Sequence, residues 1–308
     1  MYVEEIYLDS ITSFKNPSNV FKNLPCLKVL YLPNAEELYY PTVETYPFLP
    51  PLEIVWLPKA QVKTQYINPD STHVTDQLKL FFAPNTRYLH IDSYSSIIVI
   101  SEKATDVAVG VTRQSYLDNV YPTIIAPKGS AAWSQWQYSD EDPIKYIDSD
   151  SIIEAKGAQI RTRDNGMRFG FVLDESVFGV DLSQYKNLYK RINKEYGFAY
   201  SFDQSIDEQN ENVKTQIRAD NDDTITSKAA KRTVDGTVST YNAVFTGIPT
   251  EYINDKISAR AYVNIDGMYF YSPVITRSYS SVANSVLNDD TVEQNIKDQV
   301  KLSLNKEA

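Results

Sequence analysis

The chain has 308 residues, of which 42% are hydrophobic and 23% are charged, and its formal net charge is -10. That length predicts two domains rather than one, and the composition excludes a disordered chain. The acidic balance argues against a nucleic-acid-binding protein, because an acidic surface repels phosphate. The sequence contains no apolar run of the roughly 18 residues that a membrane-spanning helix needs, so we expect no such helix.

The first third of the chain repeats one apolar pattern four times. Each copy fits L-x-x-L-x-L, and the copies start at residues 3, 27, 52 and 78, which are 24, 25 and 26 residues apart. Leucine-rich repeats have periods of about 20–29 residues. Each unit would form one short strand and one irregular return, and stacking would bury the leucines in a continuous core. The sequence predicts a short leucine-rich-repeat solenoid over residues 1–110, with residues 94–104 as a shortened fifth copy.

A proline follows the last apolar position in three of the four copies, at Pro33, Pro58 and Pro84. Proline has no N–H to offer a strand ladder, so it ends each strand. With this proline, as in "LYLPN", the repeats resemble the BspA-type leucine-rich repeats of bacterial surface proteins. The resemblance covers roughly residues 1–110 and implies an extracellular or cell-surface protein of an anaerobic Gram-positive bacterium.

Two positions of the repeat predict an unusual surface. Side chains alternate along a strand, so the third and fifth positions of L-x-x-L-x-L point away from the core. The fifth positions are aromatic in every copy: Tyr7, Tyr31, Trp56 and Phe82. The third positions are aliphatic in three copies: Val29, Ile54 and Leu80. Adjacent strands lie about 4.8 Å apart, so we expect an aromatic file beside an aliphatic file, together called the strip.

An apolar strip on the outside of a sheet indicates contact with something. A partner would be a glycan stacking on the rings, an extended peptide or another protein, with Trp56 as its energetic centre. Alternatively the same chain covers the strip, either through the junction that carries Trp133 and Trp136 or through the following β domain. A neutral exposed surface is the third reading. The sequence leaves all three open.

The rest of the chain predicts a junction, an antiparallel β domain and a tail. Residues 111–155 mix Pro, Gly, Ser and acidic residues, as expected of a junction or solenoid cap. Residues 156–286 alternate in polarity, and Asn165-Gly166 and Asp266-Gly267 are strong hairpin signals. They predict a β-sandwich with one helix over residues 181–197, ended by Gly197. Residues 287–308 predict a helix capped by Asp289 or Asp290. The fold class is therefore mixed and mainly β.

The β domain carries a second resemblance. The stretches "GAQIR", "GMRFGF" and "ARAYVNIDGMYFYS" resemble an uncharacterised β-rich module appended to surface and cellulosome-associated proteins of gut and rumen Firmicutes. The resemblance covers roughly residues 150–285. It implies an exported protein and carries no activity with it.

The sequence contains little that predicts catalysis. Its two histidines and one cysteine stand in no metal-binding or nucleophile motif, and we expect neither a metal nor a cofactor. Carboxylates are plentiful, but no glycosidase pair can be identified from sequence. We therefore expect a non-catalytic binding or adhesion protein that uses the strip. The alternatives are a carbohydrate-binding component of a polysaccharide-degrading system and a structural spacer whose strip is covered internally.

Overall fold

The computed structural model describes residues 3–15, 24–40, 52–61, 63–66, 77–93, 95–111, 113–130, 144–202 and 232–304. These residues are mainly β, as predicted, and they form two compact units. The first unit contains residues Met1–Ser149 together with two later segments, Ser176–Asn193 and Ile265–Met268. The second unit contains the remaining residues from Asp150 onward.

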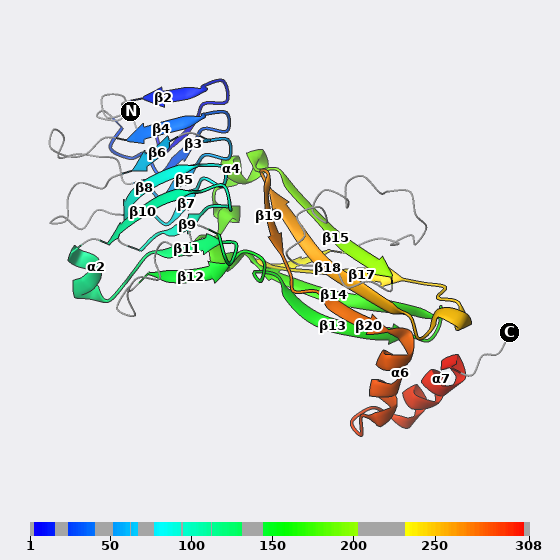
Figure 1. The fold of residues 1–308 in the computed structure, drawn as a ribbon. Coiled ribbons are helices and arrows are strands. Elements are labelled where there is room, and N and C mark those ends of the chain that lie inside the picture. Colours follow the sequence, from blue (N-terminus) through cyan, green and yellow to red (C-terminus); the bar gives the residue numbers. More distant parts are fainter. Residues whose placement is uncertain are drawn as a thin grey trace. The chain divides into compact units, whose positions relative to one another are not determined.

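The repeated strands form one parallel sheet, which confirms the predicted solenoid (Figure 1). Its order is β1-β3-β5-β7-β9-β11-β12. The strands are β1 (Glu5–Tyr7), β3 (Val29–Tyr31), β5 (Ile54–Trp56), β7 (Leu80–Phe82), β9 (Ile97–Val99), β11 (Thr123–Ala126) and β12 (Lys145–Asp148). The shortened fifth copy is thus present as β9. Within residues 111–155, expected to be a junction, β11 and β12 extend the same sheet.

The returns between these strands are not irregular, contrary to the sequence prediction. Each of the first five carries a second strand, and these pair in parallel as a five-stranded sheet. The strands are β2 (Ser13–Lys15), β4 (Glu37–Tyr40), β6 (Lys63–Tyr66), β8 (Tyr88–Ser93) and β10 (Asp106–Val111). They were missed because the first three have only three or four residues, too few to show the period-2 alternation that indicates a strand.

The solenoid core lies between the two sheets. The central residues of the first-sheet strands, such as Leu30, Val55 and Phe81, are fully buried and pack with Leu38 and Leu89 of the second sheet. Because side chains alternate along a strand, the residues on either side of each central position point out of the core. The core therefore fixes which side chains form the strip.

The same tight turn follows three strands of the first sheet. In each turn a backbone N–H donates to the C=O three residues earlier, at 3.3 Å. The pairs are Ala35 to Leu32, Ala60 to Leu57 and Thr86 to Ala83. The predicted prolines are the second residues of these turns, where the fixed φ of proline is favourable.

The second unit contains two separate antiparallel sheets. The first has the order β13-β14-β17-β16, and the second has β15-β18-β19 with β20 paired to β18. The strands of the first are β13 (Glu154–Arg161), β14 (Gly166–Asp174), β16 (Thr233–Asp235) and β17 (Val238–Phe245). Those of the second are β15 (Lys194–Phe202), β18 (Lys256–Ile265), β19 (Met268–Tyr271) and β20 (Ile275–Ser278).

Aromatic rings join the two sheets of this unit. Phe171 of β14 and Tyr241 of β17 lie 5.5 and 5.6 Å, centroid to centroid, from Phe198 of β15. Phe245 lies 5.2 Å from Tyr200, also of β15. Tilted and edge-to-face pairs at these distances are favourable arrangements.

Both predicted hairpins are present. Asn165 stands at the end of the turn between β13 and β14 with φ 45°, and Asp266-Gly267 is the two-residue turn between β18 and β19. Asp266 and Gly267 have φ 47° and 94°, the left-handed values that a type I′ turn requires. The Asp266-Gly267 turn belongs to the first compact unit, although both its strands continue in the second.

The prediction of one helix in the β domain is wrong. Residues 181–197 contain the 3₁₀ helix η3 (Leu182–Gln184) and the six-residue helix α4 (Lys186–Arg191), and Gly197 lies within β15 rather than at a helix end. A longer helix, α6 (Tyr279–Asn288), begins at a capping box between Ser278 and Ser281. The predicted tail helix is α7 (Gln294–Leu304), while Asp289 is the C-cap of α6.

The remaining short helices are α2 (Arg113–Asp118), η2 (Glu175–Phe178) and η4 (Thr250–Tyr252). No helix of the described ranges has the length and apolar character needed to cross a membrane.

Candidate functional site: the covered strip

The two files of the strip stand in register, as the repeat predicts. Parallel pairing places Tyr7, Tyr31, Trp56 and Phe82 side by side on successive strands. The same pairing aligns Val29, Ile54 and Leu80. One apolar pattern in the sequence thus becomes two continuous rows on one face of the first sheet.

The aromatic file is ordered by ring contacts. Trp56 and Phe82 stack with a centroid distance of 4.0 Å and an interplanar angle of 7°. Tyr7 and Tyr31 are 5.7 Å apart and tilted by 54°. These contacts hold each ring against its neighbour along the file.

The strip is not an open surface. Trp56 and Phe82 are each 1% exposed, Tyr31 is 5% exposed, and the three aliphatic residues are fully buried. Tyr7, at the end of the file, is half-buried. Because these side chains point away from the solenoid core, another part of the chain must exclude water from them. The alternative in which the same chain covers the strip is therefore the arrangement observed.

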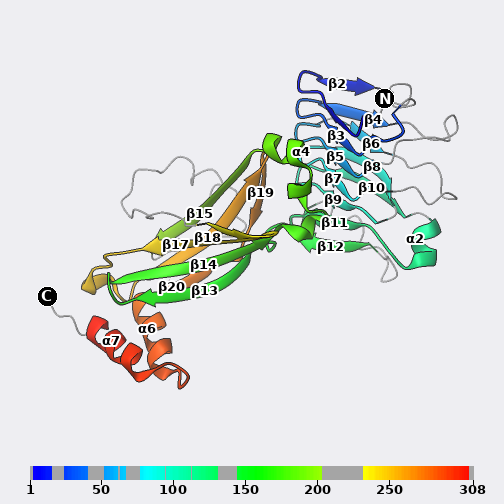
Figure 2. The same cartoon turned by 180° about the vertical axis from the view of Figure 1, so that it is seen from behind.

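Two segments of the first unit provide the cover. The covering segment is Ser176–Asn193, and the covering turn is Ile265–Met268. The covering segment buries Phe178, Leu182, Leu188 and Ile192. Figure 2 shows α4 and the short turns before it lying beside the strands of the first sheet. Both segments fall in the range predicted as the β domain, so part of that range belongs to the solenoid unit.

Polar contacts surround the apolar centre, and in three of them the covering segment donates to a carboxylate of the solenoid. The Tyr185 hydroxyl donates to Glu53 Oε2 at 2.6 Å. Asn187 Nδ2 donates to Glu5 Oε2 at 2.8 Å. Arg191 Nη1 donates to Asp9 Oδ2 at 2.8 Å. An apolar centre with a polar rim is the usual anatomy of a protein interface.

Arg191 also contacts the aromatic file. Its guanidinium carbon lies 4.6 Å from the centre of the Tyr7 ring, and its carbonyl oxygen accepts a hydrogen bond of 3.4 Å from the Tyr31 hydroxyl. Burial, followed by the charges of Asp266 and Asp9, raises the pKa of Tyr31 to about 12. Tyr31 therefore stays protonated and remains a donor at neutral pH.

Asp266 joins all three parts of the site. Its Oδ2 accepts from the Trp56 indole Nε1 at 2.7 Å, and its Oδ1 accepts from the Asn193 N–H at 2.9 Å. The Asp266 N–H in turn donates to the Asn193 carbonyl at 3.0 Å. One carboxylate thus connects the strip, the end of the covering segment and the covering turn.

The carboxylates of the site respond differently to burial. Burial raises the pKa of Asp266, although the hydrogen bonds from Asn193 and Trp56 act in the opposite direction. Burial also acts to raise the pKa of Glu53, but hydrogen bonds from Lys79 and Tyr185 outweigh it and hold that pKa below its ordinary value. Asp266 is the group of the two that is harder to keep charged.

The pKa shift of Asp266 predicts a pH-dependent stability difference. A folded-state pKa above the unfolded value of about 4 means that the folded state binds the proton more tightly. This contribution to stability is fully present below pH of about 4 and is lost as pH rises through the folded pKa. Asp266→Asn cannot titrate there. We expect the free energy of unfolding of the wild type, minus that of Asp266→Asn, to fall as the pH rises above about 4. Urea denaturation across this range measures it, and a constant or rising difference would contradict the assignment.

Gly179 allows the covering segment to approach the solenoid closely. Its φ is +70°, and a Cβ placed there would lie 2.7 Å from Ile97 Cγ1. Gly179→Ala should therefore lose the roughly 1–2 kcal/mol that left-handed backbone costs an L-residue, plus the cost of the clash. Gly129→Ala is the matched control, because its φ is +84° and nothing lies within 4 Å of the added Cβ. Equal losses of stability in urea denaturation would show that Ile97 is not close to Gly179.

The site differs from the sequence prediction in two respects. Trp133 and Trp136, the secondary candidates, lie outside the described residues. Asp266, Asn193, Arg191 and Tyr185 were not predicted as members of the site. Asp266-Gly267 carried only a hairpin signal, and the apolar spacing around Tyr185 carried only a helix signal. Neither pattern predicts that these residues contact a surface formed by residues far away in the sequence.

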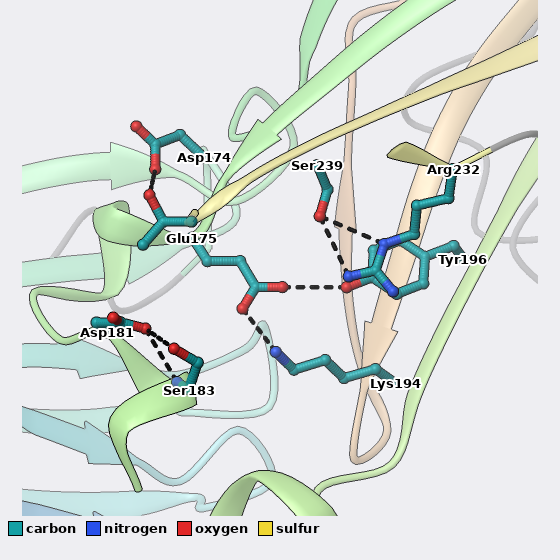
Figure 3. A network of polar contacts seen from close by, with 9 residues as sticks. Asp174, Glu175, Asp181, Ser183, Lys194, Tyr196, Arg232 and Ser239 are labelled. Atoms are coloured by element: carbon teal, nitrogen blue, oxygen red, sulfur yellow. Dashed lines mark hydrogen bonds and ion pairs between the residues drawn. The ribbon is translucent and has the colours of Figure 1, made fainter. Parts of the chain in front are cut away.

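The second unit contains a separate polar network, shown in Figure 3. Glu175 Oε2 accepts from Lys194 Nζ at 2.6 Å, and Glu175 Oε1 accepts from the Tyr196 hydroxyl at 3.0 Å. The Arg232 guanidinium carbon lies 4.0 Å above the Tyr196 ring, and its nitrogens donate to Ser239 Oγ. Each Glu175 oxygen thus accepts from a neighbouring side chain, and the Glu175–Lys194 pair is largely buried.

Comparison of the chain with protein-family models, with curated proteins and with solved structures gave no match.

Proposed function

We propose that the chain is a non-catalytic structural and binding protein in which the strip is an internal docking face. The observation that carries this proposal is the hydrogen bond between Trp56 and Asp266, formed by a tryptophan that is 1% exposed. Carboxylates at the strip accept hydrogen bonds from neighbouring donors, so their geometry is that of an interface. Of the three hypotheses for the strip, which are partner binding, internal cover and a neutral surface, internal cover has the most support.

The proposal also includes the type of repeat, the architecture of the second unit and the location of the protein. The solenoid is of the leucine-rich-repeat kind, supported by the spacing of its strands and the proline-containing turns. The second unit is a β-sandwich, supported by the aromatic contacts between its two sheets. An extracellular or cell-surface location and a BspA-type relationship are supported by the repeat motif alone. A glycan platform would need exposed rings, and the buried state of Trp56 and Phe82 does not favour it.

Acrylamide quenching of tryptophan fluorescence tests the proposal. The variant Trp133→Phe/Trp136→Phe keeps Trp56 as the single tryptophan, since the chain has three. We expect Trp56 to resist quenching in the folded protein and to be quenched freely in urea. Free quenching in the folded protein would mean that the strip is open, and the proposal would fail. Binding of glycans or proteins by the wild type, abolished by Trp56→Ala, would instead favour an open binding face.

A further inference from the structure

The covering segment combines buried apolar side chains with little regular structure of its own. Its longest helix, α4, has six residues, too few for a helix that is stable alone. Its conformation therefore depends on the surface beneath it. Its polar contacts include an ion pair, Arg191–Asp9, whose side chains are 41% and 55% exposed, and such pairs contribute little.

Releasing this segment would break no strand pairing. The ladder between β14 and β17 ends at Asp174, and β15 begins at Lys194, so the segment is a loop between two strand ends. A loop whose backbone hydrogen bonds are local and which takes part in no sheet opens at lower free energy than strands do. Asp266 holds the far end of the loop through Asn193 and contacts Trp56 at the same time.

The pattern of contacts defines the chemistry that the strip accepts. The covering segment contributes buried apolar side chains, above all Leu182 and Leu188, and its hydrogen-bond donors meet the carboxylates of Glu5, Asp9 and Glu53. In these three contacts the solenoid accepts and the covering segment donates, whereas the Tyr31 hydroxyl donates to the Arg191 carbonyl oxygen. A segment with the opposite charge pattern would meet repulsion from these carboxylates.

We propose that the covering segment is a displaceable internal ligand of the strip, and that a short apolar peptide with donors at the positions of Tyr185, Asn187 and Arg191 takes its place when it is released. This rests on the proposed function, because it requires the strip to be a docking face. Tethering at both ends gives the covering segment a high effective concentration. A free peptide should therefore bind weakly until the tethered one is impaired.

The binding test uses the full chain and a fluorescein-labelled peptide of residues 176–193. Leu188→Asp in the protein places a charge in the apolar centre while leaving the strip unchanged, and Lys186→Asp introduces aspartate at an exposed position of the same segment. Fluorescence anisotropy should show the peptide binding at least about tenfold more tightly to Leu188→Asp than to the wild type or to Lys186→Asp. A peptide that itself carries Leu188→Asp should not bind.

Hydrogen exchange on the unmodified chain tests release without any variant. Backbone amides of the covering segment should exchange at least about tenfold faster than those of β5 and β7. Exchange at the same rate as those strands would overturn the proposal, as would equal peptide affinity for wild type and Leu188→Asp, or no binding to either. These failures differ from failure of the proposed function, which would appear as free quenching of Trp56 in the wild type.

Discussion

Trp56→Ala should lower the free energy of unfolding of the solenoid unit by about 3–5 kcal/mol, the range for removing a large aromatic side chain from a core. The indole stacks on Phe82, is 1% exposed and donates to Asp266. Its removal leaves a cavity between the first sheet and the covering segment. It also leaves the buried Asp266 carboxylate without one of its two donors, which adds a desolvation cost. Urea denaturation followed by circular dichroism measures the loss.

Trp56→Phe separates the two contributions. Phenylalanine keeps a ring against Phe82 but cannot donate to Asp266, so we expect a loss of about 1–3 kcal/mol, the cost of an unsatisfied buried acceptor. If Trp56→Ala cost less than about 1 kcal/mol, the side chain would behave as an exposed one. The internal-cover account would then be wrong.

Removing one partner of the Glu175–Lys194 ion pair should cost about 3–5 kcal/mol, because the remaining charge is buried and uncompensated. The two side chains are 10% and 9% exposed, and the donor and acceptor lie 2.6 Å apart. Lys194→Met keeps the length of the side chain and removes the charge. The loss should appear in the unfolding transition of the second unit.

A double-mutant cycle shows whether the loss comes from the pair or from packing. Glu175→Gln/Lys194→Met has no buried charge, so it should be more stable than Lys194→Met alone. Glu175→Gln retains an oxygen that accepts from Tyr196, which limits other changes. Additive losses in the double variant would mean that the two charges do not interact, contrary to the geometry.

Sequence predicted the first sheet well because its strands share one apolar pattern with one period. Each copy of L-x-x-L-x-L must bury its leucines, and stacking is the only arrangement that does so along the chain. The second sheet shows a weaker pattern, since Phe14, Leu38 and Leu89 align in register but Thr64 takes the same position in "KTQY". Hydrogen bonds between the backbones of neighbouring coils form those strands, and the local sequence alone did not predict this pairing.

The helices α4 and α6 show that local helix propensity did not decide where helices form. Tyr279–Asn288 contains three serines and two valines, which are indifferent helix formers, yet it is the helix α6 because Ser278 and Ser281 cap each other. Lys186–Arg191 lies in a stretch with helical spacing but forms only six helical residues. Its Leu188 packs in the cover of the strip, and this tertiary contact overrides the local pattern.

The sequence predicted the strip but not the segments that cover it. The register of Tyr7, Tyr31, Trp56 and Phe82 follows from the repeat, because alternation and stacking are local rules. The cover does not follow, because its contacts join residues far apart in sequence: 132 positions separate Tyr185 from Glu53, and 210 separate Asp266 from Trp56. A single sequence identifies an apolar surface but not which later segment covers it.

Internal cover of the strip can be tested through the hydrogen bond from Trp56 to Asp266, because nuclear magnetic resonance observes the indole proton. The indole N–H signal of Trp56, assigned by its absence in Trp56→Phe, should exchange slowly with water in the wild type. It should lose that protection in Asp266→Ala, because the acceptor at 2.7 Å is gone. An indole proton that exchanges as fast in the wild type as in an exposed tryptophan would contradict the internal cover of the strip.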